Sequence, residues 1–197
     1  MLDTLLFDLM GTVVYDPYRE ALEAATAMEL SVAFAHRDPA SWPQFELGAI
    51  DEDEFVRRFF ADPDGEHRFD IDAFHRVRRD GYQLLPGMQE LLQSLRGVDC
   101  YIASNYPVWI DSLCAEFGLD TTFRGIYASC HMGVRKPDPA FFSAILDDLS
   151  RPAERCLFVD DRVENCEAAA GVGMQVHVFT GAEELAARLR TEGLLPA

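Results

Sequence analysis

Polar side chains that could handle a metal ion and an anion follow several short apolar segments of the chain. Two adjacent acids come directly after the apolar residues 156–159, and another acid lies near the end of the first apolar run, residues 4–9. Hard divalent cations prefer carboxylate oxygens, so the adjacent acids suit an ion such as Mg²⁺. A hydroxyl, an amide and an amine follow later segments and could contact an anion. These residues are Asp8, Ser104, Asn105, Lys136, Asp160 and Asp161.

The apolar segments have the length and composition of β-strands, and segments with helical spacing alternate with them. We predict strands at 4–9, 98–103, 125–130, 156–159 and 175–179. We predict helices at 86–97, 108–117, 139–149 and 182–190, and another that follows Asp161 and runs through Ala170. This alternation indicates an α/β fold with a Rossmann-like, doubly wound parallel sheet. Ligands of such sheets bind beyond the carboxyl ends of the strands, so the polar residues should meet at one edge.

Residues 15–85 interrupt this pattern, because their apolar residues repeat at helical spacing. One helix is expected from residue 18 to about 35, where Pro39 and Pro43 break it. Two further helices are expected at 52–61 and 71–82. The chain is therefore predicted to have an α/β core, residues 1–14 and 86–197, and an inserted all-helical cap, residues 15–85. The cap should lie over the carboxyl edge of the sheet.

The formal net charge of −17 argues against a nucleic-acid partner, because no basic face is available for phosphate backbones. An anionic substrate remains compatible with this charge if a metal ion and one or two cations are concentrated at the site. The apolar runs are shorter than a membrane span, so no membrane partner is expected. Five cysteines without a CxxC spacing, and an N-terminus unlike a signal peptide, favour a cytoplasmic protein. The sequence leaves monomer and homodimer open.

Four segments resemble, in order, the sequence motifs of the haloacid dehalogenase superfamily, and each lies at or just past a predicted strand end. They are residues 7–13, 102–105, 133–138 and 158–162. Residues 45–50 with Glu54 and Phe55 are similar to the cap of the α-glucose-1-phosphatase and epoxide-hydrolase N-domain branch. Residues 105–109, together with Met10, are similar to plant members described as FMN hydrolases. The resemblance covers the predicted core and implies a hydrolase of this superfamily with a cap domain.

This resemblance implies that Asp8 is a nucleophile that attacks phosphorus and forms an aspartyl-phosphate, which water then hydrolyses. It also implies a Mg²⁺ ion held by Asp8, by the backbone carbonyl of Met10 and by Asp160, with Asp161 in support. The remaining roles concern a small phosphorylated substrate, such as a nucleotide or FMN. Ser104 and Lys136 would bind the phosphoryl oxygens, Thr12 and Asn105 would orient nucleophile and substrate, and Tyr15 and Glu46, with Tyr18 and Tyr106, would lie near the substrate.

Met10 is a departure from the superfamily pattern, which has a second Asp there as general acid and base. A thioether cannot transfer a proton, and such help is typically worth about 10² to 10⁴-fold. Hydrolysis is therefore expected to be slow or restricted to good leaving groups. Dehalogenases and phosphonatases of the superfamily also lack this Asp, so cleavage of a carbon–halogen or carbon–phosphorus bond is an alternative. A domain that only binds a phosphorylated ligand or a protein partner is another.

Each candidate site residue also has a purely structural interpretation. Asp8 could belong to an ordinary turn before Gly11, and the adjacent acids could cap the following helix. Ser104 could likewise be a helix cap, and Lys136 a solvated loop residue. The four motifs in register favour the catalytic interpretation.

Overall fold

A parallel five-stranded sheet forms the centre of the protein, for which we analysed a computed structural model describing residues 2–62 and 65–196. The strand order is β5-β4-β1-β6-β7. The strands are β1 (Thr4–Phe7), β4 (Asp99–Ser104), β5 (Ile126–Ala128), β6 (Cys156–Asp160) and β7 (Gln175–Val178). The central strand β1 is buried along its whole length, as expected of a parallel sheet covered on both faces. The predicted α/β fold is confirmed.

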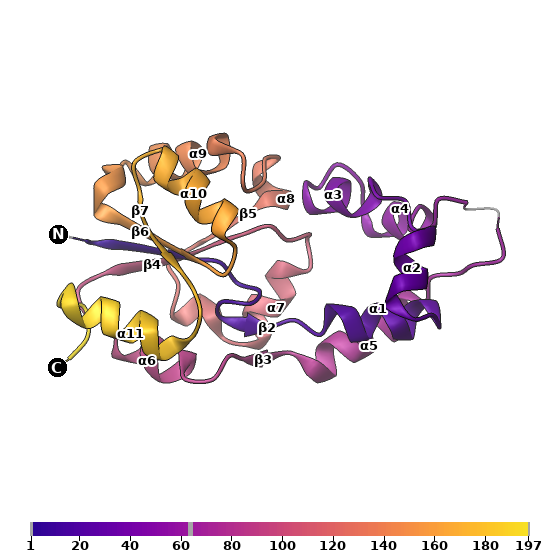
Figure 1. Ribbon diagram of the computed structural model, residues 1–197, viewed down its shortest axis with the longest axis horizontal. Coiled ribbons are helices and arrows are strands. Elements are labelled where there is room, and N and C mark those ends of the chain that lie inside the picture. Colours follow the sequence, from indigo (N-terminus) through magenta and orange to yellow (C-terminus); the bar gives the residue numbers. More distant parts are fainter. Residues whose placement is uncertain (1, 63–64, 197) are drawn as a thin grey trace.

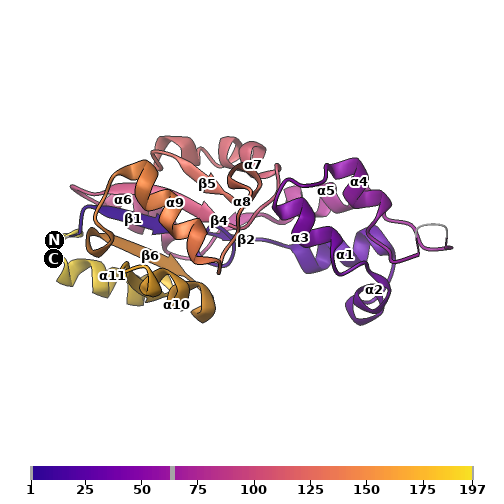
Figure 2. The ribbon, with the colours of Figure 1, turned by 90° about the horizontal axis from the view of Figure 1, so that it is seen from above.

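Helices cover both faces of the sheet, in two layers that lie above and below the strands in Figure 1; Figure 2 looks down on the upper layer. The helices of one layer are α6 (Met88–Ser94), α7 (Ile110–Glu116) and α11 (Ala182–Thr191), and those of the other are α9 (Pro139–Leu149) and α10 (Val163–Gly171). Side chains of β1 alternate between them. Leu5 and Phe7 pack in the cluster with α6, α7 and α11, whereas Leu6 packs with α9 and α10.

The strand registers place three chain exits next to one another. Phe7 pairs with Ile102 of β4 on one side and with Val159 of β6 on the other. The residues that follow, among them Asp8 and Asp160, therefore leave the sheet at the same carboxyl edge. The loop between β1 and β2 (Val14–Tyr15) starts there.

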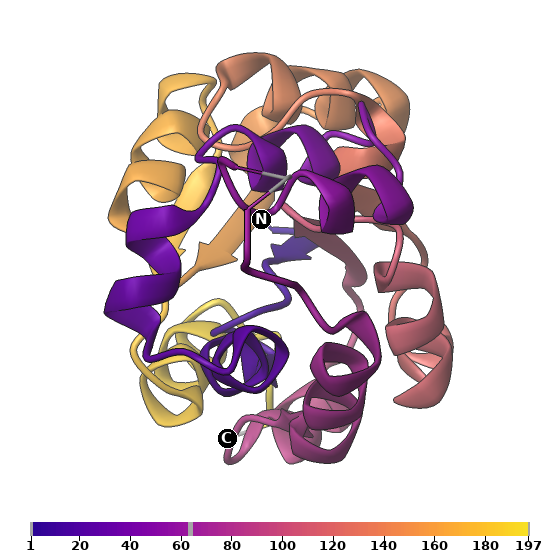
Figure 3. The ribbon, with the colours of Figure 1, turned by 90° about the vertical axis from the view of Figure 1, so that its right-hand side faces the viewer.

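In the part of the chain that the structure describes, five helices lie beyond this edge, between β2 and β3 (Gln83–Leu84), and we call them the helical region (Figures 1 and 3). They are α1 (Tyr18–Thr26), α2 (Leu30–His36), α3 (Ser41–Glu46), α4 (Glu52–Arg57) and α5 (Ile71–Gly81). Their buried side chains form a cluster separate from the two sheet layers, rich in phenylalanine. Trp109, at the start of α7, packs against this cluster from the core side.

Several expected element bounds were wrong within the helical region. The expected helix over 18–35 is two helices, because α1 ends at Thr26 and the next residue, Ala27, has a left-handed φ of 53°. Pro43 lies inside the first turn of α3 instead of breaking a helix, a position where proline is tolerated. The helix expected over 52–61 ends at Arg57, since Phe60 forms a β-bridge with Arg37. The ends of the segment 15–85 are strands, β2 and β3, which pair antiparallel.

One strand of the core is also shorter than expected. The segment 125–130 was expected to be a strand, but β5 ends at Ala128 and Ser129 begins the short helix α8 (Ser129–Met132). This helix contacts α3 of the helical region. In the described part of the chain, no helix has both the length and the apolar character that crossing a bilayer requires.

Candidate active site

Asp8 is held at the carboxyl end of β1 with its carboxylate between a hydroxyl and an amine. Its backbone N–H donates to the Val159 carbonyl of β6 at 2.8 Å. The Ser104 hydroxyl donates to Asp8 Oδ1 at 2.8 Å, and Lys136 Nζ lies 2.9 Å from the same oxygen. The structure thus brings together the three residues that the sequence singled out as catalytic.

Lys136 lies in the loop between α8 and α9 but is almost fully buried, so it is not a solvated loop residue. Its ammonium group donates to the Ala103 carbonyl at 2.8 Å and to Asp160 Oδ2 at 2.6 Å, besides its contact with Asp8. Burial by itself lowers the pKa of Lys136, but the charges of Asp8 and Asp160 raise it above its ordinary value. The amine therefore stays protonated.

Asn105 lines the cavity and also holds the backbone of this lysine. Its Nδ2 donates to the Lys136 carbonyl at 2.8 Å, and its Oδ1 accepts from the Lys136 backbone N–H at 2.8 Å. Both ends of the amide are used, so Asn105 is a positioning residue for the lysine loop.

Asp160 is fully buried at the end of β6, and both of its carboxylate oxygens are engaged. Besides Lys136, the Asn165 side chain donates to both oxygens at 3.0 Å, and the Arg162 backbone N–H donates to Oδ1 at 2.8 Å. The sequence treated Asp160 as the main metal ligand with Asp161 in support. These contacts instead make Asp161 the acid with the freer carboxylate.

Three acids converge closely enough to hold one cation. Ligand oxygens of Asp8, Asp160 and Asp161 all lie within 4.8 Å of one another. Burial, followed by the charges of Asp8 and Asp160, raises the pKa of Asp161 to about 6. Three acids at this spacing repel one another unless a cation neutralises them, and an all-oxygen set fits Mg²⁺. The donor set therefore matches the predicted metal.

The loop after Asp8 leaves room for this cation. The hydrogen bonds of the turn run from Gly11 N–H to the Val14 carbonyl and from Val13 and Val14 N–H to the Leu9 carbonyl. They do not use the Met10 carbonyl, which the sequence assigned to the metal. Gly11 has a φ of +79°, and a Cβ there would lie 2.7 Å from Asp161 Oδ2. A side chain at residue 11 would push the Asp161 carboxylate away.

Burial raises the pKa of Asp8, and the charge of Asp160 raises it further, whereas Lys136 and the Ser104 hydroxyl lower it. A nucleophilic carboxylate must be ionised. The charge of Lys136 beside Asp8 favours that ionised form.

Asp8, Ser104, Lys136 and Asp161 line one cavity of about 180 Å³. Its lining includes Glu46 from α3 of the helical region, a residue that the sequence assigned to the substrate. The cavity is lined by Asp8, Met10, Glu46, Ser104, Asn105, Arg135, Lys136, Asp161, Arg162 and Asn165.

Four other predicted substrate residues are not part of this lining. Tyr15 is more than one-third exposed on β2, and its hydroxyl donates to Glu20 Oε1 at 2.6 Å. Tyr106 donates instead to Asp16 Oδ2 at 3.3 Å, and Tyr18 packs on Trp42. Thr12 is fully buried, and its hydroxyl has no hydrogen-bond partner in the described part of the chain. None of the four therefore faces the cavity as a lining residue.

Arg135, Arg162 and Asn165 were missed as functional candidates. Arg135 precedes Lys136 in a quoted motif, and its position beside that lysine was the available signal. Asn165 is a buried polar residue on α10 that faces Asp160, a contact that the sequence pattern does not encode.

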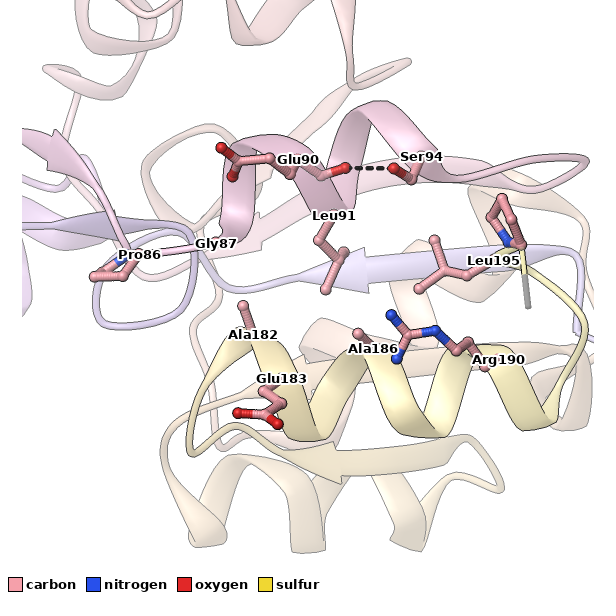
Figure 4. A pocket seen from close by; sticks show the side chains of 11 residues that line it. Pro86, Gly87, Glu90, Leu91, Ser94, Ala182, Glu183, Ala186, Arg190 and Leu195 are labelled. Atoms are coloured by element: carbon pink, nitrogen blue, oxygen red, sulfur yellow. Dashed lines mark hydrogen bonds between the residues drawn. The ribbon is translucent and has the colours of Figure 1, made fainter.

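A wider groove of about 530 Å³ lies elsewhere, between α6 and α11 on the core (Figure 4). Leu91, Ala186 and Leu195 point into it. None of the converging acids lines it, so it does not compete with the carboxyl-edge cavity as the candidate active site.

Comparison with known protein families identifies the class of protein that has this fold. A model of haloacid dehalogenase-like hydrolases matches residues 2–173. The chain belongs to this family. Flavin mononucleotide hydrolase 1 of Arabidopsis thaliana is 36% identical over 195 residues, which are 98% of this chain and 78% of that protein. Sesquiterpene phosphatase astK of Aspergillus oryzae is 33% identical over 140 residues, 68% of this chain and 69% of that one.

Solved structures show the same fold. A HAD-like family hydrolase of Porphyromonas gingivalis has a TM-score of 0.78 at 22% identity, over 98% of each chain. A HAD family enzyme of Bacteroides thetaiotaomicron, solved with magnesium and inorganic phosphate, has a TM-score of 0.72 at 20% identity, over 92% of this chain and 96% of that one.

Proposed function

We propose that the protein is a Mg²⁺-dependent phosphatase of small phosphorylated metabolites and acts through an aspartyl-phosphate at Asp8. One observation carries this proposal. The Asp8 carboxylate shares a single cavity with a buried cation, a hydroxyl and two further acids. That combination suits in-line attack on a phosphoryl group, where negative charge must be neutralised.

The side chains divide the work as follows. Asp8 attacks phosphorus with the oxygen that Ser104 and Lys136 do not hold, and the ester oxygen leaves. Lys136 balances the charge on the phosphoryl oxygens and keeps Asp8 ionised. Asn105 fixes the lysine loop through its two backbone contacts. Water then attacks the aspartyl-phosphate and regenerates Asp8.

We assign the metal to Asp8, Asp161 and the Met10 carbonyl, with Asp160 beside them. A bound Mg²⁺ would offset the repulsion between the carboxylate nucleophile and the anionic substrate. The related Bacteroides enzyme was solved with magnesium and phosphate, which supports this choice. Asp160 would act mainly by holding Lys136 and Asn165, because both of its oxygens are engaged.

We propose that the helical region is a cap that selects the substrate. It supplies Glu46 to the cavity and lies over the carboxyl edge of the sheet (Figure 3). FMN is the first substrate to test, because the related Arabidopsis protein is an FMN hydrolase and aligns along 98% of this chain. Other phosphorylated metabolites of modest size follow.

The test is phosphate release from FMN and a panel of phosphorylated metabolites, with and without Mg²⁺. Asp8→Asn is the control, since it keeps the shape of the side chain but removes the nucleophile. We expect Mg²⁺-dependent release by the wild type and none by the variant. Failure of the wild type to release phosphate from the whole panel would overturn the proposal. Halide release without added metal would instead identify a dehalogenase.

A further inference from the structure

Glu46 is a buried acid of the helical region that borders the same cavity as Asp8 and Met10. We propose that Glu46 is the general acid and base of the reaction, in the role that Met10 cannot fill. This inference rests on the proposed phosphatase function and adds a catalytic residue to it. It also changes the expectation that Met10 restricts the protein to good leaving groups.

The two carboxylate oxygens of Glu46 are in different states. Oε1 accepts a hydrogen bond from Trp42 Nε1 at 2.7 Å, which fixes the side chain. Oε2 forms an ion pair with Arg135 Nη2 at 3.0 Å, but among the described residues it accepts no hydrogen bond. A buried polar atom without a partner is costly in a structural residue. A substrate oxygen or water in the cavity would provide that partner.

The core holds Glu46 in place through the backbone of Glu46 itself and of Gly48. The Ser129 hydroxyl of α8 donates to the Glu46 carbonyl at 2.5 Å. Two residues later, Gly48 approaches the core so closely that a Cβ there would lie 2.7 Å from the Cys130 carbonyl oxygen. Glu46 is thus positioned by the core as well as by its own helix, as a catalytic group must be.

The charges around Glu46 allow it to exchange a proton. Burial raises its pKa, whereas Arg135 beside it, the Trp42 hydrogen bond, and the charges of Lys136 and Arg162 lower it, and the net direction is upward. A carboxyl group with a raised pKa can be protonated when the substrate arrives and ionised after it has given its proton away. Methionine at residue 10 has no such group.

The proposed steps balance as follows. Asp8 forms a bond to phosphorus, the bond between phosphorus and the ester oxygen breaks, and the proton of Glu46 moves to that oxygen to release an alcohol. Glu46, now ionised, accepts a proton from water as the water oxygen attacks the aspartyl-phosphate. The bond between phosphorus and Asp8 breaks, inorganic phosphate leaves, and Glu46 is protonated again.

Glu46→Gln tests the assignment, because it keeps the size and the hydrogen bond to Trp42 but cannot donate an acidic proton. Two substrates are compared. FMN is an alkyl phosphate, and p-nitrophenyl phosphate has a leaving group that needs no proton. We expect kcat/KM for FMN to fall by about 10² to 10⁴-fold. With p-nitrophenyl phosphate we expect the burst of nitrophenol to remain while steady-state turnover falls, since water still needs a base. Phosphorylated Asp8 should then accumulate.

Glu54→Gln is the matched control, a glutamate of the same helical region that pairs with Arg57 and does not line the cavity. It should leave both substrates unaffected. A second variant, Glu46→Ala, should recover turnover when formate is added as a small carboxylate, and thermal melts of all variants check folding. In the pH profile for FMN, the fall in activity at rising pH should disappear in Glu46→Gln.

The outcomes separate the two proposals. An inactive wild type would overturn the phosphatase function and this inference with it. An active wild type whose Glu46→Gln variant loses FMN and p-nitrophenyl phosphate activity equally, burst included, would overturn only the proton-transfer role. Glu46 would then be a residue that positions Arg135 or the substrate.

Discussion

Arg78 of α5 provides the sharpest stability prediction, because its charge is buried where the helical region joins the core. Its side chain is 2% exposed and pairs with Asp16 at 3.2 Å, just before α1. Tyr106 of the core donates to the same Asp16 carboxylate. The guanidinium also lies over the rings of Tyr82 and Trp109, at 5.1 and 4.7 Å from their centroids.

Arg78→Met keeps most of the volume but leaves Asp16 with a buried, uncompensated charge. Breaking a buried pair in this way costs about 3 to 5 kcal/mol. For a chain of this size, 1 kcal/mol shifts Tm by roughly 2 to 4 °C, so Tm should fall by roughly 6 to 20 °C. The double variant with Asp16→Asn removes both charges. Its loss in free energy of unfolding should be smaller than the sum of the losses of the two single variants, by on the order of 1 to 3 kcal/mol.

Urea unfolding followed by tryptophan fluorescence measures these free energies. Both tryptophans, Trp42 and Trp109, pack in the helical region's cluster and report on this junction. Arg57→Met is the control, because its pair with Glu54 is 67% exposed on the arginine side and should contribute under about 1 kcal/mol. A cost of less than about 1 kcal/mol for Arg78→Met, or strict additivity in the double variant, would refute the reasoning.

Three further results are expected. Asp161→Asn should raise the Mg²⁺ concentration needed for half-maximal activity by about tenfold or more, and EDTA should stop the wild type; full turnover in EDTA contradicts the metal assignment. Gly48→Ala should lower activity, because the new Cβ would collide with the Cys130 carbonyl oxygen. Gly97→Ala is the control: Gly97 has nearly the same φ but no atom near its Cβ, so the change should only lower stability. Equal kinetics of the two variants would show that the contact of Gly48 with Cys130 does not matter for activity. Burial lowers the pKa of His177 from 6.5, so the unfolded chain takes up the proton first and stability falls as pH drops below about 6.5. His177→Gln should flatten that fall in urea titrations at pH 7 and pH 5, and an unchanged slope would contradict it.

The sequence predicted the core well because strand ends of a parallel sheet share one edge. Asp8, Ser104 and Asp160 each follow or end an apolar strand, so their meeting could be expected without any contact being known. The same argument does not extend to the lysine. Its burial depends on Asn105 binding both backbone groups of residue 136, a tertiary contact that no local pattern indicates.

Roles within the site were harder to predict than its members. Two adjacent acids at a strand end look equivalent in a sequence, and the first was favoured as ligand. In the structure Asn165 and Lys136 donate hydrogen bonds to the carboxylate of Asp160, whereas Asp161 lines the cavity. Likewise Tyr15 lies close in sequence to the site but points to Glu20. Proximity along the chain does not determine the direction of a side chain.

The separation between residues 10 and 46 explains why the sequence suggested a catalytic defect. Judged locally, Met10 stands where the resemblance to the family implied an acid, and a methionine cannot transfer a proton. The cavity, however, is lined by both Met10 and Glu46, and Glu46 reaches it from α3. In the structure α3 is seated on α8, where the Ser129 hydroxyl donates to the Glu46 carbonyl. If Glu46 transfers the proton, closure of the helical region and completion of the catalytic site are the same event, so protection from water and proton transfer would be gained together.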